Sequence, residues 1–320
     1  MSTFSAAETA TLLPYGPLVA ALRDAALQLT AESIACPQRQ VLSMGEGGSL
    51  LSMVAVGADL AVHKLVSVVP DNRARGLPTI QGQVSVVQAS TGELLLALDG
   101  ATVTGRRTAA LSMLGVATLA AAPPRRVRLY GTGTQALHHV QALAALYPRA
   151  SVVVVGRTPA AAEGFCRTHA TTHDALSPAS TEGVPDETDL VITCTTSAEP
   201  VYRAGARAGR LVIAVGTYTP VAAEIDAGTV RGSALYVDDM TNARHEAGDL
   251  IRAQVDWTQV HSIADAMACA GAGVADTSTA RAMLFKTVGS AAWDLAAVRV
   301  AVATAATSIP ADRAGVTNLS

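Results

Sequence analysis

The sequence is unusually short of lysine. Its 320 residues include 23 lysines and arginines together, and only Lys64 and Lys286 are lysines. A lysine carries a compact ammonium that is not interchangeable with a planar guanidinium. Either lysine alone can be a chance survivor of the bias towards arginine, but the near-absence of lysine elsewhere makes both positions candidates for a specific role.

Paired cysteines and long apolar runs are also missing. The cysteines are widely scattered and form no C-x-x-C pair: Cys36, Cys166, Cys194 and Cys269. This spacing favours a reduced chain over a disulfide framework. No stretch reaches the ~18 apolar residues that span a bilayer. Residues 1–13 carry an acidic Glu8 and no cationic start of a secretion signal. We therefore expect a cytoplasmic protein.

No excess of charge points to a polyanionic partner. The formal net charge is −3, which favours neither nucleic acid nor an acidic membrane as a partner. The absence of G-x-S-x-G gives no support to a serine hydrolase of that type. His169 and His173 are four residues apart but lack a third ligand nearby, so we expect no metal site.

The length predicts two domains. In the first third of the chain a run of short strands lies between two helices, which is typical of an α+β domain. We expect helices over 14–33 and 104–121, and strands over 41–44, 50–56, 65–69, 84–87 and 94–98, with a hairpin turn at Ser90-Thr91-Gly92-Glu93.

The rhythm changes to strand–helix–strand after Pro123-Pro124. We expect strands over 127–130, 152–155, 190–194, 211–215 and 235–237, a helix over 135–146, and a long helix over 279–306. Alternating strands and helices predict an α/β fold, a Rossmann-type doubly wound parallel sheet. The expected domains are 1–122, completed by 296–320, and 123–295. The tail after 306 looks polar and loosely ordered.

A glycine-rich motif opens the second domain. Gly131-Thr132-Gly133-Thr134-Gln135-Ala136 is G-x-G-x-x-A, directly after one expected strand and at the start of a helix. The glycines permit a tight turn and let backbone N–H groups approach a pyrophosphate, while alanine permits close helix–strand packing. The position of the motif favours a dinucleotide site over the alternative, an ordinary glycine-rich turn.

The end of the next strand bears on cofactor choice. NAD-specific sites usually place an acidic residue there to hold the ribose 2′-hydroxyl. This chain has Gly156-Arg157-Thr158, a guanidinium and a hydroxyl that suit the 2′-phosphate of NADP. We expect NADP(H) to be preferred over NAD(H). The alternative is that Arg157 is a solvated surface residue.

A set of short motifs extends over roughly residues 36–295. They are Lys64 with Pro70-Asp71-Asn72 and Gly76-Leu77-Pro78-Thr79, Arg107-Thr108-Ala109-Ala110 between Thr104 and Ser112, the nucleotide loop with His139, Glu224-Ile225-Asp226, Val237-Asp238, Glu246-Ala247-Gly248-Asp249-Leu250 and Phe285-Lys286-Thr287-Val288-Gly289. In type and order these motifs resemble the ornithine cyclodeaminase and mu-crystallin family. The resemblance implies a homodimer whose N-terminal domain supplies the substrate pocket and the dimer contact.

The resemblance also implies how the substrate is held. Its carboxylate would be bound by Arg39, Lys64 and Arg107, with Thr79 near the substrate and the nicotinamide. An amino- or imino-acid carboxylate can accept a bidentate guanidinium and a point-charge ammonium. For each of the three cations a solvated surface position is the alternative, and for Arg39 it is nearly as good.

Further residues are expected at the cofactor. Thr195 or Thr196 follows an expected strand and should line the crevice at the carboxyl ends of the strands. Val215 and Val288 fall in family motifs and are taken as cofactor-binding residues as well. Lys286 can be assigned only to structure or to proximity to the cofactor, and His139 to packing or helix capping.

One residue departs from the cyclodeaminase pattern. Those enzymes carry a catalytic aspartate after the strand that here ends in Ala214-Val215-Gly216, and Thr217 takes its place. A threonine cannot act as a carboxylate base at neutral pH. The resemblance is therefore to the reductase branch, which reduces cyclic ketimine carboxylates with NADPH. Catalytic roles are expected for Lys64, Arg107 and Thr217, with Lys64 or a water held by Thr217 as proton donor. The alternatives are an ornithine cyclodeaminase or alanine-type dehydrogenase, and a non-catalytic binding protein of the crystallin type.

Overall fold

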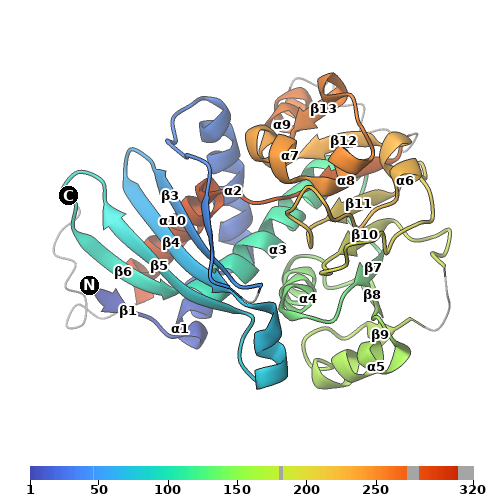
Figure 1. The fold of residues 1–320 in the computed structure, drawn as a ribbon, viewed down its shortest axis with the longest axis horizontal. Coiled ribbons are helices and arrows are strands. Elements are labelled where there is room, and N and C mark those ends of the chain that lie inside the picture. Colours follow the sequence, from blue (N-terminus) through green and yellow to red (C-terminus); the bar gives the residue numbers. More distant parts are fainter. Residues whose placement is uncertain (46, 180–182, 272–280, 309–320) are drawn as a thin grey trace. The chain divides into compact units, whose positions relative to one another are not determined.

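The computed structural model describes residues 1–45, 47–179, 183–271 and 281–308 (Figure 1). The chain forms two compact units. Unit 1 is Met1–Arg107 joined by the chain from Ser290 onward, and unit 2 is Thr108–Gly289. The sequence pattern placed the boundaries after residues 122 and 295. The first boundary in the structure falls inside helix α3 (Gly100–Leu119), where no change of composition marks it.

Unit 1 contains a six-stranded sheet in the order β1-β6-β5-β4-β3-β2. Its strands are β1 (Ser2–Thr3), β2 (Gln40–Ser43), β3 (Ser49–Val56), β4 (Leu60–Val68), β5 (Ile80–Gln88) and β6 (Leu94–Asp99). Strands β2 to β6 form an antiparallel meander, and β1 joins β6 in parallel. The α+β prediction is confirmed. Strand β4 begins at Leu60, five residues before the expected start at Leu65.

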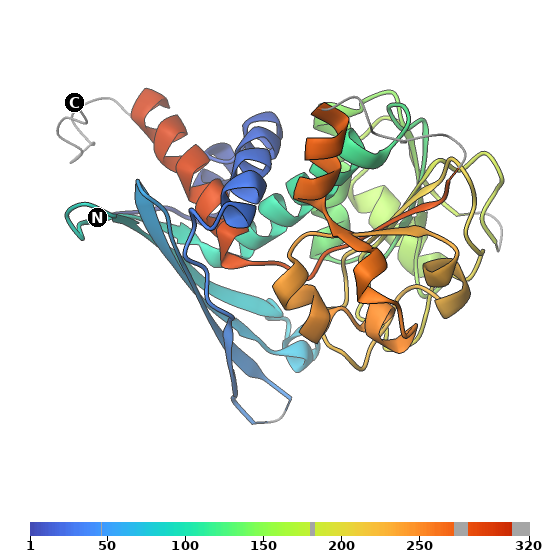
Figure 2. The same ribbon diagram turned by 90° about the horizontal axis from the view of Figure 1, so that it is seen from above.

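Helices cover one face of this sheet. Helix α2 (Tyr15–Thr30) packs against α10 (Ala291–Ser308), and α10 lies on β3 and β4 (Figure 2). Alternate residues of β3 and β4 are buried on this face, as the period of two in a half-covered sheet requires. The short helix α1 (Ala6–Thr11) and the 3₁₀ turn η1 (Pro70–Arg75) complete unit 1. In the described part of the chain, no helix combines the length and apolarity needed to cross a bilayer.

Unit 2 is a doubly wound α/β unit, as predicted. Its eight strands are all parallel, in the order β13-β12-β14-β11-β10-β7-β8-β9. They are β7 (Arg126–Tyr130), β8 (Ser151–Val155), β9 (Leu176–Pro178), β10 (Leu190–Thr193), β11 (Leu211–Ala214), β12 (Ala234–Val237), β13 (Val260–Ser262) and β14 (Met283–Lys286). The order reverses at β7, between β8 and β10, which is where such sheets bind ligands.

The connections of unit 2 are mostly helical. They include α4 (Thr134–Leu146), α5 (Pro159–Thr168), α6 (Ala227–Arg231), α7 (Met240–Glu246), α8 (Gly248–Arg252), η2 (Trp257–Gln259) and α9 (Ile263–Gly271). Helix α4 follows β7 directly, so the glycine-rich motif joins a strand to a helix as expected.

The long helix expected over 279–306 is wrong in its first part. Met283–Lys286 forms β14, which pairs with both β11 and β12, and the helix begins only at Ala291. A short apolar run is compatible with a buried strand as well as with a buried helix, and here two distant partner strands decide. Residues 279–280 and the tail from 309 onward lie outside the described residues.

His139 packs inside unit 2 and has no access to solvent. Its Nδ1 donates to the carbonyl oxygen of Gln135 at 2.7 Å, and its Nε2 accepts from the Ser112 hydroxyl at 2.9 Å. Burial lowers the pKa of His139 to about 4, against the opposing effect of the Gln135 hydrogen bond. The ring therefore joins α3 to α4 in its neutral form.

We predict that this buried ring makes unit 2 sensitive to acid. Below pH 6.5, the ordinary histidine pKa, the unfolded chain binds a proton that the folded chain excludes until the pH approaches 4. Stability that is complete above pH 6.5 is lost as the pH falls, by ~2 kcal/mol at pH 5. Urea unfolding at neutral pH and at pH 5 should show a smaller loss for His139→Leu than for the wild type. An equal loss in both would contradict this role.

Candidate functional site

Unit 1 contains a buried cation pair on one carboxylate. Lys64 lies on the covered face of β4 between the buried Val62 and Val66, and its side chain is 3% exposed. Its Nζ lies 2.7 Å from Oδ2 of Asp294 in the first turn of α10. The Nε of Arg107, from α3, lies 3.3 Å from the other oxygen, Oδ1. One aspartate therefore holds two of the three cations expected at the substrate carboxylate.

The third expected cation, Arg39, acts electrostatically on Lys64. Burial lowers the pKa of Lys64 to about 8, and the positive charges of Arg107 and Arg39 lower it further, against the raising effect of Asp294. Arg39 is half-buried. Unit 1 thus brings the charges of Arg39, Lys64 and Arg107 within electrostatic range of one another, and Asp294 is the described carboxylate that meets Lys64 and Arg107.

Asp294 is a residue that the sequence pattern did not single out. It was covered by the expected helix over 279–306, where an acidic residue is unremarkable. The available signal was its setting, because an aspartate within the apolar run Ala291–Ala297 needs a charged partner once the helix is buried. Thr79 is half-buried at the end of the loop after η1, where its carbonyl oxygen accepts from Val69 N at 2.8 Å. No hydrogen bond from Thr79 to the cations occurs among the described residues.

The glycine-rich motif of unit 2 lies at the point where the strand order reverses. Gly131 has φ +123°, and a Cβ at this position would lie 2.5 Å from the carbonyl oxygen of Cys194, directly after β10. Only glycine permits this approach of the two chain segments. Gly133 precedes α4 and provides no side-chain cap, and Ala136 is fully buried. The first-turn N–H groups of α4, beginning at Thr134 and Gln135, are therefore left for an anion.

A cavity of about 520 Å³ lies beside the end of β8. The described residues that line it include three arginines, Arg128, Arg157 and Arg203, and no aspartate or glutamate. Arg157 is exposed. The hydroxyl of Thr158 accepts from Ala161 N at 3.2 Å and so caps α5. Thr158 is therefore a helix cap in this structure.

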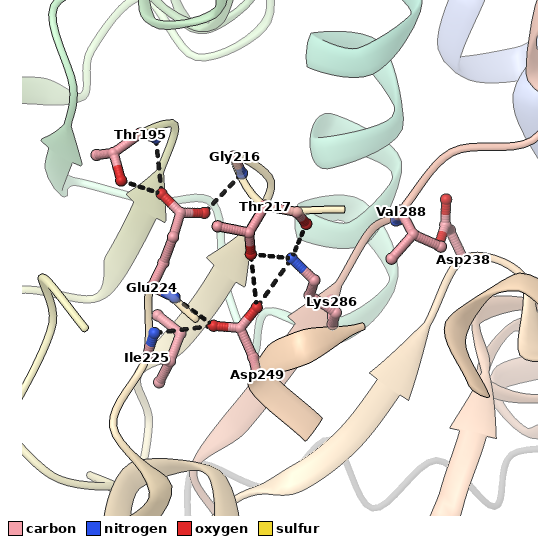
Figure 3. Close-up of polar contacts among 9 residues, drawn as sticks. All are labelled: Thr195, Gly216, Thr217, Glu224, Ile225, Asp238, Asp249, Lys286 and Val288. Carbon is pink, nitrogen blue, oxygen red and sulfur yellow. Dashed lines mark hydrogen bonds and ion pairs between the residues drawn. The ribbon is translucent and has the colours of Figure 1, made fainter. Parts of the chain in front are cut away.

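Two buried carboxylates hold the loops after β10 and β11 (Figure 3). Glu224 accepts from Thr195 N at 2.7 Å, the Thr195 hydroxyl at 2.8 Å and Gly216 N at 2.6 Å. Asp249 accepts from Glu224 N at 2.6 Å and Ile225 N at 2.9 Å through one oxygen. The Thr217 hydroxyl donates to its other oxygen at 3.1 Å. Thr195 and Thr217 thus lie at the strand ends, but their hydroxyls are bound to protein carboxylates.

Lys286, the second lysine, completes this network. Its Nζ lies 2.9 Å from Asp249 Oδ2 and donates to the Thr217 carbonyl at 2.6 Å and to the Thr217 hydroxyl at 3.2 Å. Burial favours a higher pKa for Asp249, but Lys286 outweighs it and lowers the pKa. Burial raises the pKa of Glu224, and Asp249 adds to this while Lys286 opposes it. Lys286 is therefore a structural partner of the loop that carries Thr217.

The remaining expected cofactor residues lie beside these loops. Val215 is half-buried directly after β11. Val288 N and Gly289 N donate to the carboxylate of Asp238 at 3.0 and 2.8 Å, so an acidic residue also fixes the segment after β14. The sequence had placed Asp238, Glu224 and Asp249 in motifs without a role. Across the described ranges, no group of three or more His, Cys, Asp or Glu side chains could hold a metal ion.

Comparisons with known proteins agree on one family. The sequence model of the ornithine cyclodeaminase/mu-crystallin family matches residues 8–308. The chain is 52% identical over 312 residues to the Δ1-pyrroline-2-carboxylate/Δ1-piperideine-2-carboxylate reductase of Azospirillum brasilense, covering 98% of this chain and 97% of that protein. It is also 52% identical over 298 residues to Δ1-pyrroline-2-carboxylate reductase 2 of Burkholderia ambifaria, covering 93% and 94%.

A solved structure is similar over nearly its whole length. It is Δ1-pyrroline-2-carboxylate reductase of Thermococcus litoralis in complex with NADH and L-proline, with a TM-score of 0.87 and 25% sequence identity. The match covers 96% of this chain and 98% of that chain.

Proposed function

Because the chain belongs to the ornithine cyclodeaminase/mu-crystallin family, we propose that it reduces cyclic ketimine carboxylates with NADPH. The substrates are Δ1-pyrroline-2-carboxylate, which gives proline, and Δ1-piperideine-2-carboxylate, which gives pipecolate. The similarity to reductases of these compounds supports the proposal. The observation that carries it is the buried cation set of unit 1, in which Asp294 is the one carboxylate beside Lys64 and Arg107 among the described residues.

The two lysines differ in how fully their ammonium groups are bonded. An ammonium has three N–H donors. Lys286 has three oxygen partners, two from Thr217 and one from Asp249. Lys64 has one, Asp294, among the residues described, and Asp294 is shared with Arg107. Two donors of Lys64 are thus left for a ligand carboxylate, which supports a substrate role for Lys64 and a structural role for Lys286.

The cation set fixes the substrate for reduction. Arg107 meets Asp294 through Nε, so the edge formed by its two terminal nitrogens is left for a bidentate contact with the substrate carboxylate. Lys64 and Arg39 add charge from other directions. When bound, NADPH supplies the hydride for the imine carbon. A small rigid ring held by its carboxylate has little freedom to move, so positioning contributes much of the rate.

The imine nitrogen must carry a proton when the hydride arrives. Of the two expected donors, a water on Thr217 is the weaker, because the Thr217 hydroxyl donates to Asp249. The pKa of Lys64 is lowered to about 8, mainly by burial, which is suited to proton transfer near neutral pH. Lys64 is therefore assigned both the carboxylate contact and the proton.

The site supports reduction over cyclodeamination. A cyclodeaminase needs a carboxylate base where this chain has Thr217. The neighbouring Asp249 does not replace it, since its oxygens are engaged by Lys286, Thr217 and two backbone N–H groups. No free carboxylate base is left at this position within the described residues.

NADPH is preferred over NADH because the end of β8 is basic. A 2′-phosphate placed in the cavity beside Arg157 would meet guanidinium groups, and none of the described lining residues would repel it.

The homodimer expected from the resemblance is also proposed here. The outer face of the unit 1 sheet exposes Val54, Val56 and Leu65, and an exposed apolar patch of this kind supports a subunit contact.

The proposed activity is tested directly with purified protein. It should oxidise NADPH when given either ketimine acid, because one methylene in an apolar pocket discriminates by only ~1–3 kcal/mol. Δ1-Pyrroline without its carboxylate is the matched control and should be reduced poorly. Ornithine should release no ammonia, since position 217 has no carboxylate. Ornithine-dependent ammonia release without imine reduction would refute the proposal.

Cofactor choice is tested by Arg157→Asp. The change replaces attraction of the 2′-phosphate by repulsion, so kcat/KM with NADPH should fall far more than with NADH. Arg167→Asp is the control, because Arg167 lies on α5 with its side chain 74% exposed and does not line the cavity. A wild-type enzyme that prefers NADH, or an Arg157→Asp variant that loses both cofactors equally, would contradict the assignment.

A further inference from the structure

Asp294 is the least expected member of the substrate site. It lies in the first turn of α10 and has no solvent exposure. The first turn of a helix favours a negative charge, and α10 packs on the strand that carries Lys64. Each carboxylate oxygen meets a different cation, Oδ1 the Arg107 guanidinium and Oδ2 the Lys64 ammonium.

The two contacts of Asp294 fix the orientation of the Arg107 guanidinium and the position of the Lys64 ammonium. Because Arg107 is held through Nε, its guanidinium plane is fixed and its two terminal nitrogens form the available edge. The Lys64 ammonium is held 2.7 Å from Oδ2 as an ion pair, which fixes the place of its charge beside Arg107. Without the carboxylate, two like charges would lie in a desolvated space with no counter-charge, and their mutual repulsion would separate them.

The charges that face Lys64 come from three other segments. They are Asp294 of α10, Arg107 of α3 and Arg39 of the segment before β2. The register partners of Lys64 on the neighbouring strands are Met53 and Val84, which carry no charge. His63 directly precedes Lys64 on β4, so its side chain lies on the opposite face of the sheet, where it meets Ser52 at 3.0 Å. Asp294 is thus the one anion among the described groups that act on Lys64.

We propose that Asp294 is a positioning residue of the substrate site, which fixes Lys64 and Arg107 in the orientation that receives the substrate carboxylate and keeps Lys64 as an ammonium. The inference rests on the proposed function and adds a residue to it. Asp294 acts through the two cations and makes no contact with the substrate.

The test is the pH dependence of Asp294→Asn. The Lys64 ammonium is present below the pKa of Lys64, about 8, and is lost above it, so kcat/KM of the wild type should fall as the pH rises through this value. Removing the charge of Asp294 should move that fall to lower pH by ~1–3 units. At neutral pH the KM for Δ1-pyrroline-2-carboxylate should rise at least ~10-fold, and acidification should recover part of the loss. The KM for NADPH should not change.

Asp59→Asn is the matched control. Asp59 also anchors α10, through Arg299 at 2.6 Å, but is not among the groups that act on Lys64. This variant should keep the wild-type pH profile and KM. Asp294→Glu keeps the charge and should keep the alkaline fall near its wild-type pH while KM rises, because the carboxylate is displaced. It also serves as the test if Asp294→Asn does not fold.

The inference is overturned by a folded Asp294→Asn variant with the wild-type KM and the wild-type alkaline fall. It is equally overturned by an Asp294→Glu variant whose alkaline fall moves as far as that of a neutral residue. If the wild type reduces no ketimine, the proposed function fails by itself. Binding of pyrrole-2-carboxylate, followed by calorimetry across the same pH range, then tests Asp294 separately through the same expected shift between wild type and variant.

Discussion

The central constraint on this structure is that an ammonium buried away from water needs a counter-charge to offset its loss of hydration. Both lysines of the chain are buried, and each is paired with an aspartate, Lys64 with Asp294 in unit 1 and Lys286 with Asp249 in unit 2. A buried cation without a partner would be discharged or would destabilise the fold. The two lysines of the sequence thus stand at two sites where a compact, strongly hydrated cation is paired with a fixed carboxylate.

The Lys286–Asp249 pair and the Lys64–Asp294 pair differ in how many oxygen partners the ammonium has. Lys286 is saturated by its partners and fixes the loop after β11, together with the Glu224 contacts to the loop after β10. Lys64 has one oxygen-bearing partner within the described part of the chain, Asp294, and burial is the main reason that its pKa is lowered to about 8. The first pair gives the strand ends of the nucleotide-binding unit a defined shape. The second leaves charge available for an anionic ligand, at a pKa close to the working pH.

Local patterns in the sequence were sufficient for most of the fold. The alternation of strands and helices after Pro123-Pro124 predicted the parallel sheet. The glycine-rich motif predicted its strand-to-helix turn, because each of the small residues of the motif has a local reason to be small. Strand β14 was missed because Met283–Lys286 has no local feature that excludes a helix, and its pairing with β11 and β12 is decided far away in the chain. The two compact units divide inside α3, and a continuous helix carries no local sign of such a division.

The site was predictable where a residue type is chemically distinctive. Arg39, Lys64 and Arg107 were singled out because arginine and lysine suit a carboxylate. The anions were not: Asp294, Glu224 and Asp249 have meaning only through the partners that folding brings to them. Thr158 and Thr195 illustrate the converse, since hydroxyls expected at the cofactor are used to cap α5 and to bind Glu224.

In this account Lys64 binds the substrate carboxylate, whereas Lys286 stabilises the fold. The most direct measurement compares Lys64→Ala with Lys286→Ala in steady-state kinetics and thermal unfolding. Loss of one partner from a desolvated charge contact costs ~2–5 kcal/mol, so Lys64→Ala should lower kcat/KM for the ketimine acid ~30- to ~5,000-fold with NADPH binding nearly intact. Lys286→Ala should lose stability, because it leaves Asp249 buried without its counter-charge. Near-normal turnover by a folded Lys64→Ala variant would contradict the account.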